Sequence, residues 1–306
     1  MKIVIVGAGA VGGYFGTRLH NAGADVTFLV REKRAEQLRQ HGLFIDSMKG
    51  DAFWERTSFE TEPQKLKQAD LIILATKGYH LEGTIDLLRS TVEANTYILP
   101  LLNGVKHYHL LTDLFGKEKV VGGLANIVAT LNEKGHIIHT SKVDRITFGA
   151  LHESQTSICE EFAQWAEKAN MQVSWTDSIP KAIWNKYMFI TAFSGITTAA
   201  DVSTGAIRQE EAAKQLFINV LMEMKQLAQA EGIRLTEQDV ETAIDALEQL
   251  PGDATSSMHQ DFRKGLAIEV EHLQGYALQL AQTHQLELPT LKTIYGMIKA
   301  KSHATT

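Results

Sequence analysis

The chain has 306 residues, of which 30 are lysine or arginine and 36 are aspartate or glutamate, so its formal net charge is −6. This length predicts about two domains, and a hydrophobic content of 44% is that of a globular protein. The negative charge argues against a general nucleic-acid or anionic-membrane binder, and the single cysteine, Cys159, excludes an intrachain disulfide and a thiolate metal cluster.

In the first half of the chain, short apolar runs rich in β-branched residues alternate with segments of helical length. The runs occupy residues 3–6, 26–30, 71–75 and 97–99. This alternation is typical of βαβ units and predicts an α/β domain built on a parallel, Rossmann-type sheet with helices on both faces.

The pattern changes over residues 119–150, where strand-like runs follow one another without intervening helices. Strands are expected over residues 120–130, 136–139 and 145–148, with a tight turn near residues 132–135. These runs predict a small antiparallel extension of the sheet. A helix over residues 158–168 and a last strand near residues 172–175 are expected to follow.

Strand signals end there, and the rest of the chain has a helical pattern. Asp177 and Ser178 precede Pro180, an order typical of a helix start, and apolar residues then recur at spacings of three and four up to Gly232. Further helices are expected over residues 236–250, 256–283 and 290–299. We therefore expect an all-α C-terminal domain of residues 178–306 after an N-terminal domain of residues 1–177.

A glycine-rich motif lies between the first strand and the first helix. Its residues are Gly7, Ala8, Gly9, Ala10, Val11 and Gly12. In this context a G-x-G-x-x-G spacing predicts dinucleotide binding, because the glycines permit a tight turn, a close approach of the backbone to a pyrophosphate, and close packing of helix on strand. The N-terminus of the helix then offers free N–H donors to the phosphates.

The end of the second strand indicates which dinucleotide is bound. Arg31 follows this strand, with Lys33 and Arg34 close behind, and an arginine at this position suits a 2′-phosphate. Glu32 could instead face a ribose hydroxyl, but cations flank it. We therefore expect NADP(H) as the cofactor, with Arg31 as a ligand. Lys33 and Arg34 can also be explained as the solvated start of a helix.

Two further candidates follow later strands of the sheet. Lys77 comes directly after the strand at residues 71–75, where ligands of open α/β sheets bind, although a solvated lysine is an equally good explanation. Asn103 and Gly104 hold the corresponding place after the next strand. The amide of Asn103 could hold the nicotinamide ribose, bind a substrate, or cap the following helix.

With these motifs in place, the chain resembles the ketopantoate reductase (2-dehydropantoate 2-reductase) family over nearly its whole length. The resemblance is carried by the glycine motif, by Thr76-Lys77, Asn103-Gly104, Trp184-Asn185-Lys186 and Ser256-Ser257-Met258-His259-Gln260-Asp261, and by Glu269, Glu271 and Gly275. It implies a Rossmann domain followed by a helical domain, and NADPH-dependent reduction of ketopantoate to pantoate in pantothenate biosynthesis.

The resemblance also implies roles for individual residues. Lys186 would be the general acid that protonates the developing alkoxide while hydride reaches the carbonyl carbon of a 2-oxo acid. Glu269 would orient this lysine or hold a substrate hydroxyl. Ser257 and Asn103 would bind polar groups of the substrate.

Three positions depart from the family pattern. Family members commonly carry asparagines four and eight residues after the catalytic lysine, on the same helix face, and this chain has Ile190 and Ser194 there. Thr204 replaces a loop asparagine. A buried substrate hydroxyl left without its partner costs about 1–3 kcal/mol. Ile190 and Ser194 are expected to line the substrate site, so the substrate is either ketopantoate in a differently built pocket or a related 2-oxo acid with a more apolar tail.

Two other classes of protein remain as alternatives. Another dehydrogenase with a Rossmann and a helical domain could also use a lysine at position 186. A non-catalytic NADP(H)-sensing protein is favoured by the lost asparagines, whereas the retained Lys186 and Glu269 argue against it.

The remaining expectations concern partners and location. The twelve histidines are scattered, so no metal site is expected, and Cys159 is interpreted as a packing residue. No apolar stretch reaches the roughly 18 residues of a spanning helix, so we expect a soluble, cytoplasmic protein. Its partner would be a small 2-oxo acid rather than nucleic acid or membrane, and the chain is compatible with a homodimer.

Overall fold

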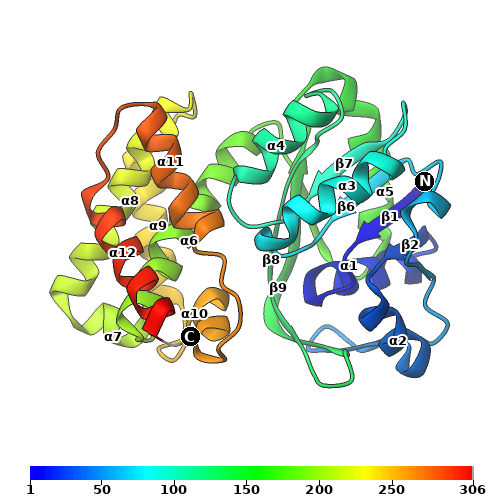
Figure 1. The fold of residues 1–306 in the computed structure, drawn as a ribbon, viewed down its shortest axis with the longest axis horizontal. Helices are drawn as coiled ribbons and strands as arrows, with labels where there is room; N and C mark the ends of the chain where they lie inside the picture. Colours follow the sequence, from blue (N-terminus) through cyan, green and yellow to red (C-terminus); the bar gives the residue numbers. More distant parts are fainter. Residues whose placement is uncertain (305–306) are drawn as a thin grey trace. The chain divides into compact units, whose positions relative to one another are not determined.

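A computed structural model describes residues 1–304 and divides the chain into two compact units (Figure 1). The first unit comprises Met1–Leu102 and His107–Ile179, and the second comprises Asn103–Lys106 and the chain from Pro180 onward. The short segment Asn103–Lys106, which lies inside the N-terminal domain by sequence position, therefore packs with the helical unit.

The first unit is built on a five-stranded parallel sheet with the strand order β5-β2-β1-β6-β7. The strands are β1 (Lys2–Val6), β2 (Asp25–Leu29), β5 (Phe59–Glu60), β6 (Leu71–Leu74) and β7 (Tyr97–Pro100). The central strand β1 is buried on both faces, which explains why its sequence is continuously apolar. The predicted Rossmann-type parallel sheet is confirmed.

A second, mixed sheet completes this unit. Its strands are β3 (Leu43–Ser47), β4 (Ala52–Trp54), β8 (Gly122–Leu131), β9 (Ile137–Gly149) and β10 (Gln172–Trp175). The antiparallel pair β8–β9 matches the expected extension, but β9 also pairs in parallel with β3 and β10. Two strands expected over residues 136–139 and 145–148 are one strand, and β3 and β4 were not predicted. Such short strands gain their stability from pairing across the sheet, which no local pattern reveals.

Helix α1 (Ala10–Asn21) lies between the two sheets and is buried along most of its length. Glycines make this close packing possible: a Cβ atom on Gly13 would lie 2.7 Å from Cδ1 of Ile137, and one on Gly16 would lie 2.5 Å from Cδ1 of Ile5. The hydroxyl of Tyr14 donates a hydrogen bond of 2.7 Å to the buried carboxylate of Asp144. The start of α1, where the glycine motif lies, is therefore held rigidly.

The other helices of the first unit are α2 (Glu32–His41), α3 (Leu81–Thr91), α4 (Lys106–Phe115, which starts in the second unit) and α5 (Thr156–Lys168), with the short 3₁₀ turns η1 (Pro63–Lys65), η2 (Gly78–His80) and η3 (Glu153–Gln155). The second unit contains α6 (Ile179–Ala200), α7 (Thr204–Gln209), α8 (Glu211–Ala230), α9 (Glu237–Gln249), α10 (Ser257–Arg263), α11 (Tyr276–Thr283) and α12 (Pro289–Ala304), with a π-helical turn, η4 (Glu271–Gly275). The predicted helical domain is confirmed. None of the helices within residues 1–304 is both long and apolar enough to cross a membrane.

The continuous helix expected over residues 256–283 is wrong. Helix α10 ends at Arg263, and Gly265 adopts a φ of +66°, a left-handed conformation that ends helices. The amide of Leu266 donates back to the carbonyl of Asp261, which closes this end. Residues 266–270 then run without helical structure to the π turn, so Glu269 lies on an irregular segment and not on a helix.

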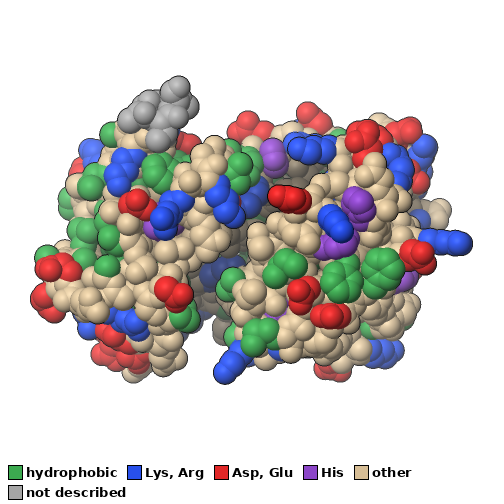
Figure 2. All heavy atoms as spheres, turned by 90° about the horizontal axis from the view of Figure 1, so that it is seen from below, with side chains coloured by type: hydrophobic (Ala, Val, Ile, Leu, Met, Phe, Trp, Pro, Cys, Tyr) green, Lys and Arg blue, Asp and Glu red, His purple; other side chains and the backbone are tan. Residues whose placement is uncertain are grey.

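Charges of both signs are interspersed over the face of the molecule shown in Figure 2, in keeping with a net charge of only −6. Neither acidic nor basic side chains form one continuous patch on that face. A specific anion site therefore depends on local geometry and not on one continuous charged patch of this face.

Burial of histidine side chains makes the stability of the fold fall at low pH. It is the largest cause of a lowered pKa for five histidines, namely His20, His80, His136, His139 and His272. As the pH falls below about 6.5, the unfolded chain binds protons that the folded chain resists, so stability is lost in that range and is fully present above it.

We therefore expect the Tm to fall by several degrees, roughly 3–8 °C, between pH 7.5 and pH 5.5, measured by calorimetry at constant ionic strength. Because His139 is buried and its Nδ1 lies 2.8 Å from the hydroxyl of Ser47, a His139→Gln variant should show a smaller fall than the parent. A Tm that stays level or rises over this range would contradict the expectation.

Candidate active site

The glycine motif forms an open turn at the carboxyl end of β1. Gly7 has a φ of +100°, and a Cβ atom on Gly12 would lie 2.0 Å from the carbonyl oxygen of Gly7, so neither position accepts a side chain. A Cβ atom on Gly9 would meet no atom within 4 Å, so the turn is open at the residue that is expected to face the pyrophosphate.

The start of α1 is suited to an anion. Gly9 is the N-cap and provides no side-chain cap, and the first turn carries no acidic residue. The N–H groups there are therefore left for a ligand, and the helix dipole favours negative charge. The residues present fit the pyrophosphate of a dinucleotide.

At the end of β2, the structure separates the roles of three neighbouring charged residues. Arg31 is exposed as the N-cap of α2, whereas the Nε of Arg34 donates a 2.8 Å hydrogen bond to the carbonyl of Ala8 in the glycine turn. Burial lowers the pKa of Arg34 to about 10. Arg34 therefore stabilises the main chain of the glycine turn. The basic residues at positions 31–34 do not form a single phosphate-binding group.

Glu32 has a partner of its own. Its Oε1 accepts a 2.6 Å hydrogen bond from Nη1 of Arg39, two helical turns further along α2. This pairing directs the carboxylate along the helix surface. The acid that could have bound a ribose hydroxyl thus has a cationic partner on the exposed helix surface, an arrangement compatible with a site for a 2′-phosphate.

The strand order brings the ends of β2 and β6 to either side of β1. Lys77 follows β6 and is half-buried as the N-cap of η2, and His80 ends the same turn. Burial and then the charge of Arg31 lower the pKa of His80, so this histidine and Arg31 lie within electrostatic reach of each other. Nothing in the sequence indicated His80.

In the second unit, Lys186, Ile190 and Ser194 follow one another at four-residue intervals on α6, which places them on one face of that helix. Burial lowers the pKa of Lys186 to about 8, and the charge of Glu269 opposes this shift. Glu269 is only 3% exposed. A buried carboxylate near a lysine whose pKa is close to neutral is an arrangement suited to proton transfer.

The expected substrate residues next to Lys186 differ in their contacts. Ser194 is buried, and its hydroxyl accepts a 2.9 Å hydrogen bond from the side-chain amide of Gln274. Ile190 is half-buried and adds an apolar side chain to the same helix face. Thr204 is fully buried and donates a 2.8 Å hydrogen bond to the carbonyl of Ala254, so it joins the start of α7 to the loop before α10.

The remaining candidates lie on loops and helix ends of the same unit. Ser257 is exposed at the start of α10, directly after Ser256, whose hydroxyl caps that helix. Asn103 is half-buried and begins the segment that packs with the helical unit. The structure therefore brings Asn103, Lys186, Ser257 and Glu269 into one unit, whereas Arg31 and Lys77 belong to the other.

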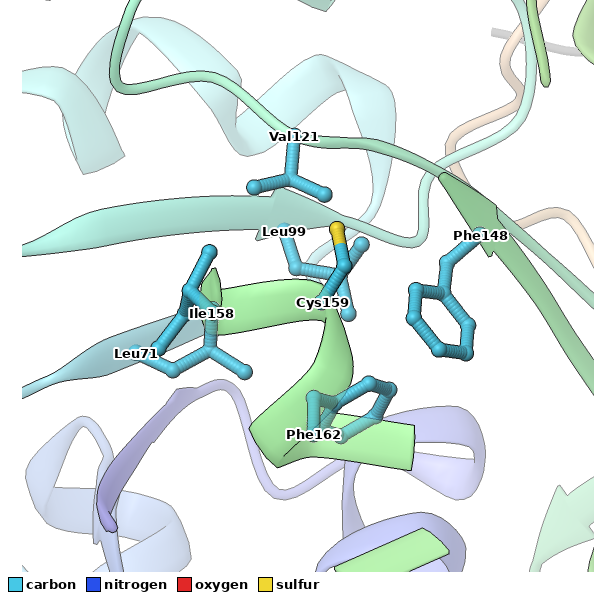
Figure 3. Close-up of a pocket in the computed structure, with 7 residues that line it drawn as sticks. All are labelled: Leu71, Leu99, Val121, Phe148, Ile158, Cys159 and Phe162. Atoms are coloured by element: carbon cyan, nitrogen blue, oxygen red, sulfur yellow. The ribbon is translucent and has the colours of Figure 1, made fainter. Parts of the chain in front are cut away.

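Two features outside these groups do not form a site. Figure 3 shows the side chain of Cys159 in a small apolar cavity lined by Leu71, Leu99, Val121, Phe148, Ile158 and Phe162. Burial raises the pKa of Cys159 to about 11, so its thiol is a packing group and not a nucleophile. Among the residues that the structure describes, no cluster of three histidine, cysteine or acidic side chains could hold a metal ion.

Comparison with known proteins identifies the relatives of this chain. The family "Ketopantoate reductase PanE/ApbA" matches residues 3–153, and its C-terminal counterpart matches residues 178–302. The chain belongs to the ketopantoate reductase family. It is therefore an oxidoreductase of the type that acts on CH–OH groups, and the cofactor of this family is NADP(H).

Individual relatives differ in what is known of them. The chain is 36% identical over 302 residues to the uncharacterized oxidoreductase YkpB of Bacillus subtilis, covering 98% of both chains. It matches the structure of a 2-dehydropantoate 2-reductase from Geobacter metallireducens with a TM-score of 0.90 and 26% identity, over 98% of this chain and 99% of the other. It also matches a D-mandelate dehydrogenase bound to NADH and anilino(oxo)acetate, with a TM-score of 0.88 over 100% and 99% of the two chains, but 22% identity shows a shared fold alone.

Proposed function

We propose that this protein reduces a 2-oxo acid to a 2-hydroxy acid with NADPH, with 2-dehydropantoate, the ketopantoate of pantothenate biosynthesis, as the first candidate substrate. The observation that carries the proposal is the environment of Lys186. Burial lowers the pKa of Lys186 to about 8, and the charge of the buried Glu269 opposes this shift. Such a lysine keeps a proton at neutral pH and releases it readily.

The first unit would hold the cofactor. The open turn at Gly9 and the start of α1 would bind the pyrophosphate, Arg31 the 2′-phosphate, and Lys77 would add a positive charge at the neighbouring strand end. When bound, the nicotinamide supplies the hydride for the reduction. The pairing of Glu32 with Arg39 supports NADPH over NADH.

The second unit would bind the substrate and supply the proton. As hydride adds to the carbonyl carbon, the π electrons of the C=O bond move to its oxygen, and that oxygen takes a proton from Nζ of Lys186. The ammonium stabilises the growing negative charge before the proton moves. Glu269 would keep Lys186 charged and oriented, while Asn103 and Ser257 would bind the polar groups of the substrate.

A second candidate function differs only in the substrate. The hydroxyl of Ser194 accepts a hydrogen bond from Gln274 and Ile190 is apolar, so the helix face beyond Lys186 offers a substrate one hydroxyl group in place of two amides. This favours a 2-oxo acid with an apolar branched or aromatic tail. The two candidates differ in whether the C4 hydroxyl of ketopantoate finds a partner.

The test is a comparison of kcat/KM, by NADPH oxidation, for ketopantoate and for 2-oxo acids with apolar tails of similar size. The Ile190→Asn variant, which restores an amide on this face, is expected to raise kcat/KM for ketopantoate about tenfold relative to the apolar acids, the worth of one buried hydrogen bond. Ile190→Leu serves as the control, since it changes shape without adding a polar group.

The outcomes separate the candidates. Turnover of ketopantoate at least a hundredfold above the apolar acids would contradict the second candidate, and the reverse order would contradict the first. Tight binding of NADPH without turnover of any 2-oxo acid would contradict both and favour a cofactor-sensing protein.

A further inference from the structure

The segment Asn103–Lys106 approaches the π turn Glu271–Gly275 unusually closely, although about 165 residues separate them in the sequence. Gly104 has a φ of +81°. A Cβ atom there would lie 3.1 Å from the carbonyl oxygen of His272 and 3.4 Å from Cδ2 of its ring. Only glycine allows this approach, so the ring of His272 lies directly against the peptide that follows Asn103.

The π turn itself sets the place of this ring. The amide of Gly275 donates to the carbonyl of Val270, five residues back, and the amide of His272 donates to the carbonyl of Glu269 over 2.9 Å. Wide turns of this kind are rare and occur often at functional sites. His272 and Glu269 are thereby fixed within one turn of backbone, and both are buried, with 4% and 3% exposure.

The ring of His272 forms a hydrogen bond with the backbone of Asn103. It therefore links two of the residues proposed for the active site, Asn103 through its main chain and Glu269 through the turn they share. We propose that His272 is a positioning residue, whose imidazole ring holds the main chain of Asn103 against the turn that carries Glu269. This inference rests on the proposed function for the roles of Asn103 and Glu269.

The charges around His272 give this contact a pH dependence. Burial lowers its pKa most, the carboxylate of Glu269 raises it, the ammonium of Lys106 lowers it, and the hydrogen bond with Asn103 raises it. Glu271, the other acid of the turn, is engaged with the Tyr295 hydroxyl and the Lys299 ammonium. The lowered pKa keeps the ring neutral at pH 7, and protonation at lower pH would strengthen its hydrogen bond to Asn103 while placing a second positive charge beside Lys106.

Two substitutions test the role of the ring. His272→Gln keeps an N–H that can reach the main chain of Asn103 but cannot take up a proton, whereas His272→Leu fills the space and donates nothing. His284→Leu is the matched control, because His284 is an exposed histidine of the same unit that pairs with Glu231.

In steady-state assays with the 2-oxo acid and saturating NADPH, His272→Leu is expected to raise KM about tenfold at pH 7.5, with the Kd for NADPH within twofold of the parent. His272→Gln is expected to keep KM within about threefold and to remove the loss of kcat/KM that is expected of the parent below pH 6.5, where protonation of the ring adds a second positive charge beside Lys106. Unchanged KM and pH profile in His272→Leu would overturn the proposal. So would a parallel loss of NADPH affinity, because that would show a general structural defect.

A measurement without turnover separates this inference from the proposed function. In NMR titrations, the amide signal of Gly104, which shares its peptide group with the carbonyl of Asn103, is expected to shift with the titration of the His272 ring. The shift should move to higher pH in Lys106→Met and disappear in His272→Gln. If no 2-oxo acid is reduced but the Gly104 amide shift follows the titration of His272, the proposed function is contradicted and the inference about His272 is supported. If the Gly104 amide shift does not follow the titration of His272, the inference is overturned.

Discussion

Replacing Lys186 by alanine is expected to lower kcat for the 2-oxo acid about a thousandfold while the Kd for NADPH changes by no more than about twofold. The loss combines that of a general acid, which contributes roughly 10²–10⁴, with that of a cation near the developing alkoxide. Binding of NADPH is spared because the glycine turn and Arg31 belong to the other unit. Stopped-flow hydride transfer and fluorescence titration with NADPH measure the two quantities separately.

The pH profile of the parent protein should reflect the titration of Lys186. The proton donor is the charged form of Lys186, and burial sets its pKa at about 8, so kcat/KM should be level between about pH 6.5 and pH 8 and fall tenfold per unit above pH 8. Glu269→Gln should move this fall to lower pH, since the carboxylate is the group that raises the pKa.

A matched control lies on the same helix. Lys181 pairs with Asp239 over 2.9 Å, so Lys181→Ala should leave kcat within about twofold of the parent. If Lys186→Ala kept more than a tenth of the parental kcat, Lys186 would not be the general acid.

The elements that the sequence predicted correctly are those whose pattern is local. The strand, glycine turn and helix over residues 2–21 follow from contiguous residues, because an apolar run, a left-handed Gly7 and an uncapped helix start are each encoded within a few positions. Helices that pack through one apolar face, such as α8, could be predicted from the sequence in the same way.

Elements that depend on contacts between distant residues were missed. The hydrogen bond from Arg34 to the carbonyl of Ala8 and the hydrogen bond from Gln274 to Ser194 each join residues that are far apart in the sequence. His272 gave no signal at all, because its meaning comes from Gly104, which lies 168 positions earlier. Periodicity describes one element at a time and cannot show which loop will be packed against it.

The interruption at residues 264–270 shows why the continuous helix predicted over residues 256–283 does not form. The apolar spacing on either side favours one continuous helix, but a left-handed Gly265 ends α10, and the chain resumes as a wide turn. The irregular segment places Glu269 in a buried position near Lys186. Local helix preference is given up there, as is common where side chains serve a site.

Arg31 is expected to decide between the two nicotinamide cofactors. Arg31→Ala should raise the Kd for NADPH about 10–100-fold and leave the Kd for NADH within about twofold, since a charge-assisted hydrogen bond contributes roughly 1.5–3 kcal/mol and only NADPH carries the 2′-phosphate. The preference of the parent for NADPH should also weaken as salt is raised, because Arg31 is exposed and its charge is screened.

Two neighbouring cations serve as controls of opposite kind. Lys33 is exposed on α2, and Lys33→Ala should change neither Kd by more than about twofold. Arg34→Met should weaken NADH and NADPH alike, because Arg34 braces the carbonyl of Ala8 in the turn that would hold the pyrophosphate common to both. Isothermal titration of the three variants with both cofactors gives the six comparisons needed. Equal effects of Arg31→Ala on the two cofactors would contradict a 2′-phosphate role and leave the pairing of Glu32 with Arg39 without consequence for cofactor choice.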